Sequence, residues 1–328
     1  MIKYLMGSSN SGETLCLLFL SMCAAVTVQA NALTNGNAEA GTLDGWTASA
    51  GGQITVVTQR TQSSGTVYPQ EGSWLFCFAT VPGSYETMEQ SGSIPAGNNT
   101  LKLSGYFQSE RLSTIDKDDF GEAVLQALNS SNEVVAEAVS GPLVAAQTLQ
   151  WEQVAVQLHV PEEAVSWRVE LRGTLRLGSY INVFYDDLQL EFSNDGISYP
   201  EWAAIHISDP GQRAPQQDAD EDGLSNLLEY SGALDPDDPE SDELFWLQRG
   251  SEVAETDVDL FYRESLIAIG ISRNFFYTAS LTNAFAPVIG RGPFVVGNDE
   301  GYEVKRVRVE DMLPDQGFFK MQLEYSGD

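Results

Sequence analysis

The chain has 328 residues, of which 47 are acidic and 17 are Lys or Arg, so its formal net charge is −30 at pH 7. A charge of this size repels phosphate groups, which excludes nucleic acid and anionic membrane surfaces as partners and favours cations. Hydrophobic residues make up 42% of the chain and aromatic residues 10%, which excludes a chain that is disordered throughout.

The first 30 residues have the pattern of a secretory signal peptide. Lys3 supplies a positive start, TLCLLFLSMCAAV (14–26) is an apolar run too short to span a bilayer comfortably, and VQA (28–30) is a small-residue cleavage site. The alternative is an N-terminal membrane anchor. We expect a secreted, extracellular protein, with the periplasm or the cell surface as further destinations, and no membrane insertion after the signal is cleaved.

Cleavage after Ala30 would remove two of the three cysteines and leave Cys77 alone. An exported chain without a disulfide needs a sizeable core, bound metals, or both. Cys77 lies in the apolar run SWLFCFAT (73–80), so we expect a buried core thiol rather than a nucleophile.

Residues 31–193 are predicted to form an all-β domain. Short runs of β-branched and aromatic residues alternate with Gly, Asn, Ser and Pro, which indicates a sandwich or a barrel, and LNSSNEVV (128–135) is typical of a hairpin turn. The expected strands are QITVVTQ (53–59), SWLFCFAT (73–80), TLKLSGYF (100–107), AVLQAL (123–128), WEQVAVQLHV (151–160), SWRVELRG (166–173) and INVFYDDLQLEF (181–192).

Three segments of this domain form a frame that resembles a known family. They are LTNGNAEAGTLDGWT (33–47), WEQVAVQLHVPEEAVSWRVELRG (151–173) and VFYDDLQLEF (183–192). Their order and spacing resemble the galactose-binding-like, jelly-roll carbohydrate-binding modules of secreted bacterial proteins. The resemblance covers about half of the chain and implies reversible binding of a polysaccharide or another glycan. The polar segment SERLSTIDKDDFGEA (109–123) departs from the frame.

The same resemblance implies a calcium ion between the first and last strands of the jelly roll. The matching positions are Asn35, Glu39, Asp186 and Asp187. Three carboxylates brought together there would need a cation. The alternative is that Glu39 only caps a turn and that Asp186 faces solvent.

Aromatic side chains are the natural candidates for sugar binding, because their faces stack on pyranose rings. Tyr106, Arg111 in the polar segment and Tyr180 in a loop are the candidates we expect to be exposed. The tryptophans of the framework segments are expected in the core instead: Trp46, Trp151 and Trp167.

Residues 194–241 are rich in Asp, Pro and Ser and are predicted to form a connector with one helix over PEWAAIHIS (200–208). Within the connector, DADEDGLSNLLEY (218–230) has the calcium-loop spacing D-x-D-x-D-G-x5-E. Alternate carboxylates point at one centre, Gly223 permits a sharp reversal, and a helix can begin at Asn226. The expected ligands are Asp218, Asp220, Asp222, the Leu224 carbonyl, Asn226 and Glu229.

The segment DGLSNLLEYSGALDPDDPES (222–241) resembles the calcium-binding repeats of thrombospondin type 3 and dockerin-like, EF-hand-like segments. One clear loop is present, whereas dockerins carry two, so a docking role is not expected. The resemblance implies bound Ca²⁺. The alternative is a solvated acidic linker without a metal.

Residues 242–328 are predicted to form a small C-terminal β domain. Its expected strands are DVDLFYRES (257–265), FFYTASL (275–281), YEVKRVRVE (302–310) and GFFKMQLEY (317–325). The succession of acidic loop, linker and short β module resembles the C-terminal regions of large exported bacterial proteins, which implies no particular activity.

No catalytic motif is evident, and we expect no enzyme. The two histidines, His159 and His206, are expected at a strand end and on an amphipathic helix, and their neighbours form no metalloprotease, hydrolase or phosphate-loop motif. The sequence therefore predicts a secreted, noncatalytic, calcium-binding protein with a glycan-binding jelly roll. The alternative is a surface adhesion or spacer protein that binds another protein.

Overall fold

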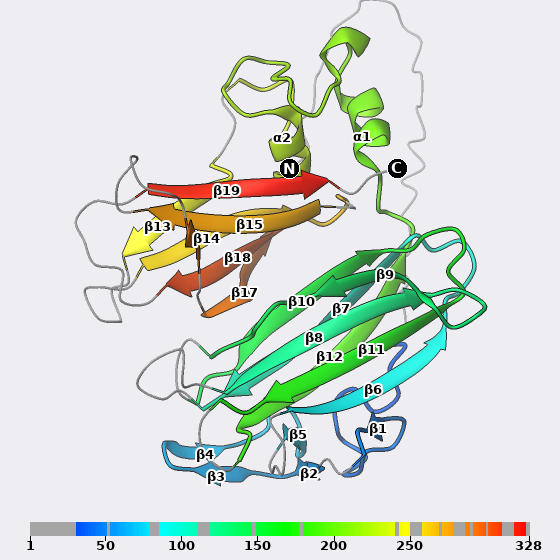
Figure 1. Cartoon of the computed structure of the whole chain (residues 1–328), viewed down its shortest axis with the longest axis vertical. Coiled ribbons are helices and arrows are strands. Elements are labelled where there is room, and N and C mark those ends of the chain that lie inside the picture. Colours follow the sequence, from blue (N-terminus) through cyan, green and yellow to red (C-terminus); the bar gives the residue numbers. More distant parts are fainter. Residues whose placement is uncertain are drawn as a thin grey trace, which may run out of the picture.

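The computed structural model describes most of the chain between residues 31 and 325. The described ranges are 31–50, 53–78, 85–110, 119–145, 149–176, 180–239, 243–249, 258–268, 271–278, 286–288, 291–299, 301–309 and 318–325. Within them the structure is mainly β, as predicted, with two short α-helices (Figure 1). Neither helix in these ranges has the length and hydrophobicity that a bilayer crossing requires.

A sandwich of two antiparallel sheets forms the N-terminal part, shown in the lower half of Figure 1. Sheet A contains, in spatial order, β1 (Thr47–Ala48), β6 (Tyr85–Ser93), β11 (Ser166–Thr174), β8 (Phe120–Leu128) and β9 (Val134–Val139). The facing part of sheet B contains, in order, β10 (Glu152–His159), β7 (Thr100–Ser109), β12 (Val183–Ser193), β5 (Leu75–Phe78) and β2 (Ile54–Val57).

The core lies between these two sheets and follows from the alternation of the strands. In β11 every second residue, including Trp167 and Leu171, is buried. Phe107 of β7 and Tyr185 of β12 point inward from sheet B, with ring centroids 5.5 Å apart, and the Tyr185 hydroxyl donates to the Arg172 carbonyl at 2.9 Å. Each large apolar side chain buried in this way stabilises the fold by about 1.5–3 kcal/mol.

A short hairpin covers part of the outer face of sheet B. It consists of β3 (Arg60–Gln62) and β4 (Gly65–Val67). Beneath it lies a second small apolar cluster of Val67, Leu75, Cys77 and Phe184. The prediction of a buried Cys77 is confirmed, since only 1% of the residue is exposed, and burial raises the pKa of its thiol to about 11.

Sheet B continues from the sandwich into the C-terminal strands. Next to β10 come, in order, β17 (Arg291–Asp299), β18 (Tyr302–Val309), β14 (Val258–Ser265) and β13 (Phe245–Arg249). β17 joins β10 at the pair Gln153–Val295, and Phe294 stacks on Phe107 with ring centroids 6.2 Å apart. A third sheet, sheet C, contains β16 (Ala286–Pro287), β15 (Ile271–Thr278) and β19 (Phe318–Tyr325). We call β13 to β19 the C-terminal unit.

Ion pairs reinforce the seam between the sandwich and the C-terminal unit. Lys102 of β7 meets Glu303 of β18 at 2.5 Å, and Arg306 of β18 meets the buried Glu152 of β10 at 2.6 Å. Lys305 precedes Arg306 on β18 and pairs with Glu264 of β14. Two neighbouring cations of one strand thus bind one acidic group of the sandwich and one of the C-terminal unit. Several of the chain's 17 basic residues are therefore used in ion pairs at this seam.

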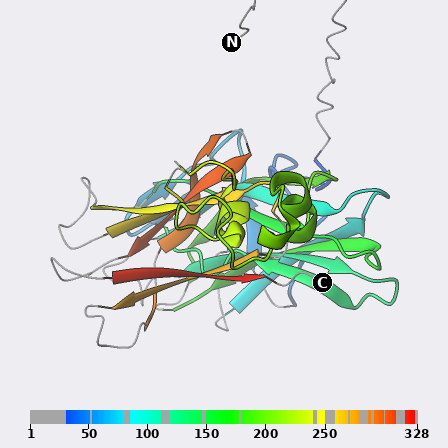
Figure 2. The ribbon, with the colours of Figure 1, turned by 90° about the horizontal axis from the view of Figure 1, so that it is seen from above.

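The connector between β12 and β13 holds both α-helices. It contains α1 (Tyr199–His206), a 3-10 turn (Pro210–Gln212) and α2 (Asn226–Gly232). The predicted helix over 200–208 is confirmed, and the carboxylate of Glu201 accepts from the Ser198 N–H at 3.0 Å, which fixes the start of α1. Figure 2 shows the two helices side by side.

Candidate metal centre

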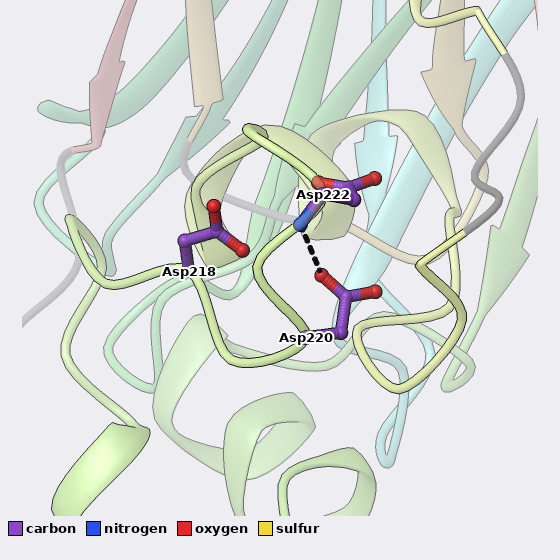
Figure 3. A group of neighbouring side chains, drawn as sticks. All are labelled: Asp218, Asp220 and Asp222. Carbon is purple, nitrogen blue, oxygen red and sulfur yellow. Dashed lines mark hydrogen bonds between the residues drawn. The ribbon is translucent and has the colours of Figure 1, made fainter.

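Three aspartates gather in the loop between the 3-10 turn and α2. One carboxylate oxygen from each of Asp218, Asp220 and Asp222 lies within 4.8 Å of the others, and all three residues are half-buried (Figure 3). They form the one cluster of three or more potential metal-binding side chains in the part of the chain that the structure describes. The alternating spacing that the sequence predicts thus brings the three side chains together.

Backbone amides hold the aspartates in place. Asp218 Oδ2 accepts from the Gly223 N–H at 2.9 Å, Asp222 Oδ1 accepts from the Leu224 N–H at 2.6 Å, and Asp220 Oδ1 accepts from the Asp222 N–H at 3.2 Å. Gly223 has φ of +99°, a conformation that L side chains rarely adopt. The glycine in the predicted position is therefore what lets the chain reverse around the aspartates.

Glu229 of α2 lies near the three aspartates, whose charges act on it, but outside the cluster that they form. The residue is 0% exposed, yet neither of its carboxylate oxygens has a hydrogen-bond partner. Asn226, also 0% exposed, donates its amide to the carbonyls of Gln212 at 2.6 Å and Ala214 at 3.2 Å, which leaves its Oδ1 without a partner. Buried polar atoms are paired in the great majority of cases, so unpaired ones need an explanation.

The unpartnered atoms coincide with the predicted ligand set. Buried oxygens without a partner are found at four of its side chains: Asp218 Oδ1, Asp220 Oδ2, Asn226 Oδ1, Glu229 Oε1 and Glu229 Oε2. Of the two remaining predicted ligands, Asp222 binds the Leu224 N–H, and Leu224 would contribute its backbone carbonyl from the same loop. Oxygen-only donors of this kind fit a hard divalent cation.

The electrostatics of the centre are unfavourable for the protein alone. Burial, and then the charges of Asp220, Asp222 and Asp218, raise the pKa of Glu229 from its ordinary 4.5 to about 8. Burial is likewise the largest cause that raises the pKa of Asp220, with the nearby Asp222 and Asp218 adding to it. A bound cation would remove this repulsion and would hold the carboxylates ionised.

The centre is anchored to the C-terminal unit through α1 and α2. Tyr230 of α2 packs edge-on against Tyr199 of α1, and the Tyr230 hydroxyl donates to the Ile197 carbonyl at 2.5 Å. Arg273 of β15 donates to the carbonyl of Ser231 in α2 at 2.6 Å, and Tyr325 of β19 contacts the Tyr199 ring. The helix that follows the aspartate loop is thus tied to α1 and, through Ser231, to sheet C.

Two carboxylates of the second predicted calcium set bind backbone amides. Glu39 Oε1 accepts from the N–H groups of Ser73 at 2.8 Å and Trp74 at 2.9 Å. Asp186 Oδ2 accepts from the N–H groups of Gln70 at 2.8 Å and Glu71 at 3.4 Å.

The remaining two members of that set are bound locally. Asn35 donates to the Thr42 carbonyl and accepts from the Ala40 N–H, and Asp187, at φ +46°, follows Asp186 in a bulge of β12. Burial raises the pKa of Asp186 to about 6. In the described ranges, Glu39, Asp186 and Asp187 do not gather into a cluster of the kind formed at 218–222.

The predicted sugar-binding residues lie on separate elements. Tyr106 is half-buried on the outer face of β7, opposite Gln153 of β10 and Asp186 of β12. Tyr180 is 53% exposed in the loop before β12, and Arg111 lies outside the described residues.

The tryptophans and histidines occupy structural positions. Trp46 and Trp167 are buried as predicted, whereas Trp151 is half-buried on the outer face of sheet B and donates to the Tyr68 carbonyl at 2.9 Å. His159 ends β10, and His206 ends α1, stacked on Trp202.

Sequence reasoning missed Gln108, whose two amide atoms are buried without a partner on the same face of β7 as Tyr106. A glutamine in a strand carries no signal of this kind.

No known family matches the sequence, and no curated protein is similar to it. Solved structures match in part. The module TmCBM61 in complex with beta-1,4-galactotriose has a TM-score of 0.35 and 17% identity, over 50% of this chain and 100% of that chain. The CBM22-1–CBM22-2 tandem domain of Paenibacillus barcinonensis Xyn10C has a TM-score of 0.37 and 12% identity, over 93% of this chain and 100% of that chain.

The enzymatically active domain of tailspike protein 4 from bacteriophage CBA120 is a further partial match. Its TM-score is 0.38 and its identity 14%, over 49% of this chain, but this chain spans only 21% of the tailspike chain. Carbohydrate-binding modules and an enzymatic domain therefore occur among the similar structures. Likeness at this level assigns neither a family nor an activity to this chain.

Proposed function

We propose that this chain is a calcium-binding β protein in which the cation orders the connector and thereby fixes the C-terminal unit. The observation that supports the proposal is the set of five buried oxygens of Asp218, Asp220, Asn226 and Glu229 that have no hydrogen-bond partner. Five such atoms facing one loop are costly for a metal-free protein, since each unpaired buried group costs about 1–3 kcal/mol.

The donor set favours calcium over other common cations. All the candidate ligands are oxygens, and zinc sites usually contain histidine or cysteine. Calcium takes six to eight oxygens in flexible geometry, whereas magnesium demands a near-ideal octahedron and retains waters. If residues 1–30 direct export, as the sequence predicts, the protein meets extracellular calcium, for which such loops have dissociation constants of about 10⁻⁴–10⁻³ M.

The role of the cation in this proposal is structural. Neutralising the carboxylates permits α2 to pack through Tyr230 against α1 and through Ser231 against Arg273 of sheet C. Because calcium binds only the folded loop, calcium at 100 times its dissociation constant stabilises the fold by about 2.7 kcal/mol. The proposal contains no catalytic step.

Calorimetric titration of the chelator-treated protein with CaCl₂ tests this function. We expect saturable binding, lost in the double variant Asp218→Asn/Asp222→Asn and retained in Asp237→Asn/Asp238→Asn, which changes the same charge at exposed positions of the connector. Equal binding by both variants, or no binding by the wild type at millimolar calcium, would refute a site in this loop.

We further propose glycan binding on the outer face of sheet B. The observation in favour is that the half-buried Tyr106 lies on the outer face of β7, where its partner position on the neighbouring strand β10 is Gln153. An aromatic face with nearby amide groups is the usual chemistry of a sugar site.

A glycan array tests the sugar proposal. We expect retention of at least one polysaccharide by the wild type and its loss in Tyr106→Ala. Tyr85→Ala is the matched control, because Tyr85 is a 50% exposed tyrosine on sheet A. If no glycan is retained, or if both variants bind equally, Tyr106 is not part of a sugar site.

A further inference from the structure

A large groove lies between the sandwich and the C-terminal unit, beside the junction of β10 and β17. Its volume is about 1610 Å³, and its walls are β9, β10 and the loops 94–99 and 161–165 on one side, with β14, β15 and β18 on the other. The groove lies away from the Asp218–Glu229 loop and from the outer-face position of Tyr106, so neither proposed site includes it.

One wall of the groove is an unpaired stretch of strand β10. β17 pairs with β10 at Gln153, and the Ala155 carbonyl accepts from Lys305 Nζ at 3.3 Å. Successive residues of an antiparallel strand point their backbone amides to opposite sides. The backbone groups of Gln157 and His159 therefore point to the same side as that of Ala155, away from β7. Among the described hydrogen bonds, none pairs the backbone of Gln157 or His159 with another strand on that side.

The opposite wall of the sandwich contributes a second unpaired edge, that of β9. The Ser140 N–H donates to the Ala123 carbonyl of β8 at 2.9 Å, so the backbone groups of Glu137 and Val139 point away from β8. β9 is the last strand of sheet A. Two free strand edges therefore line one groove, and such edges are templates for adding another strand.

The charge and apolar surface of the groove indicate what would pair there. Glu137, Glu162 and Glu163 line it, and no described Lys or Arg lies within ion-pair distance of them. Arg273 and Lys305, the lining cations, are already bound to Glu264. Exposed apolar surface is supplied by two valines, Val139 at 42% and Val165 at 49%.

We propose that this groove binds an extended basic segment of another protein, which adds as a strand to β10 with lysine or arginine side chains toward the glutamates. A second copy of this chain is a poor occupant, because each copy carries a net charge of −30. A polysaccharide is also a poor occupant, because of the two lining tyrosines Tyr262 is buried and Tyr325 packs its ring against Tyr199.

A backbone-specific pair of variants tests strand addition. The probe is a short fluorescein-labelled peptide in which lysine alternates with valine, followed by fluorescence anisotropy on the full mature protein. Gln157→Pro removes the N–H that faces the groove, at an edge position where proline is tolerated. Gln157→Ala keeps that N–H and removes only the side chain, which donates to the Leu266 carbonyl. We expect Gln157→Pro to weaken peptide binding at least about tenfold and Gln157→Ala to change it little.

A charge pair provides a second readout that does not depend on a proline in a strand. Glu137→Lys should weaken binding by about tenfold or more at low salt, whereas Glu71→Lys, an equal charge change at an exposed position outside the groove, should not. The proposal is overturned if the peptide does not saturate the wild type, or if all four variants bind alike. It is also overturned if a neutral oligosaccharide such as xylohexaose displaces the peptide from the groove. Calcium binding is measured separately in each variant, so the two proposals fail independently.

Discussion

At the scale of single residues, Glu229 is the most informative side chain in the protein. It is fully buried, and neither of its carboxylate oxygens has a hydrogen-bond partner. Its burial and the like charges of three nearby aspartates raise its pKa. The spacing alone predicts a metal-ligand role for it, because the twelfth position of the calcium loop is the one that supplies a bidentate glutamate. What the spacing could not predict was its complete burial, which depends on how α2 packs.

The first prediction concerns calcium affinity. Glu229→Gln keeps the volume of the side chain and removes one charge and a bidentate ligand, so we expect the affinity for calcium to fall at least about 100-fold. Titration calorimetry measures this. Glu221→Gln, an exposed position in the same loop, is the matched control and should keep the wild-type affinity. A Glu229→Gln variant with unchanged affinity would contradict the ligand assignment.

The second prediction concerns the protein in a chelator. The folded pKa of Glu229 is raised to about 8 from an ordinary 4.5, so this group costs the metal-free fold nothing below pH 4.5 and costs it increasingly as the pH rises from 4.5 to 8. We therefore expect metal-free Glu229→Gln to be more stable than the metal-free wild type, by a margin that widens from pH 5 to pH 8. Denaturant unfolding in EGTA measures the margin; a constant or reversed margin would show that Glu229 is not forced toward neutrality.

At the scale of elements, strands with alternating apolar residues were predictable and strands without them were not. The predicted strands over 100–107, 151–160 and 166–173 match β7, β10 and β11 closely. β6, with the sequence YETMEQSGS, was missed because the inward positions Glu86 and Gln90 are polar and carry no apolar period.

β17 was missed for a different reason, and it matters most for the architecture. Its sequence RGPFVVGND contains two glycines and a proline, which normally mark a loop. Only the fold places β17 against β10, so nothing in the sequence indicated that sheet B would run from the sandwich into the C-terminal unit.

The third prediction concerns the charged seam that this continuity creates. Burial alone would raise the pKa of Glu264 in β14, but the Lys305 and Arg273 cations outweigh it and lower the pKa to about 2. A carboxyl group whose pKa is lowered on folding stabilises the fold fully above its unfolded pKa, here 4.5, and this contribution is lost as the pH falls toward 2. Glu264→Gln should therefore cost stability at pH 7, by no more than about 3 kcal/mol for a partly exposed pair.

Unfolding of wild type and Glu264→Gln between pH 7 and pH 3 measures this difference, which should shrink below pH 4.5. Glu191→Gln, on an exposed position of β12, provides the comparison. A difference that is absent at pH 7, or that grows as the pH falls, would mean that Glu264 does not bind Lys305 and Arg273 in solution.

At the scale of the whole molecule, three regions of different composition share one framework. The shift to Asp, Pro and Ser after β12 was visible in the sequence and marks where the connector leaves the sandwich. The candidate ligand set was also visible there. How the connector contacts the rest was not, because Tyr199, Tyr230 and Tyr325 meet across more than a hundred residues of chain. In our account, the cation makes those contacts possible.

Hydrogen–deuterium exchange of the mature protein, with calcium and with EGTA, tests this account most directly. We predict that calcium slows exchange in the connector from residue 197 to 232 and in strands β14, β15 and β19, which contact α1 and α2. Strands β6, β8 and β11 of sheet A, remote from the loop, should exchange equally in both conditions. Identical exchange of the connector with and without calcium would contradict the central claim.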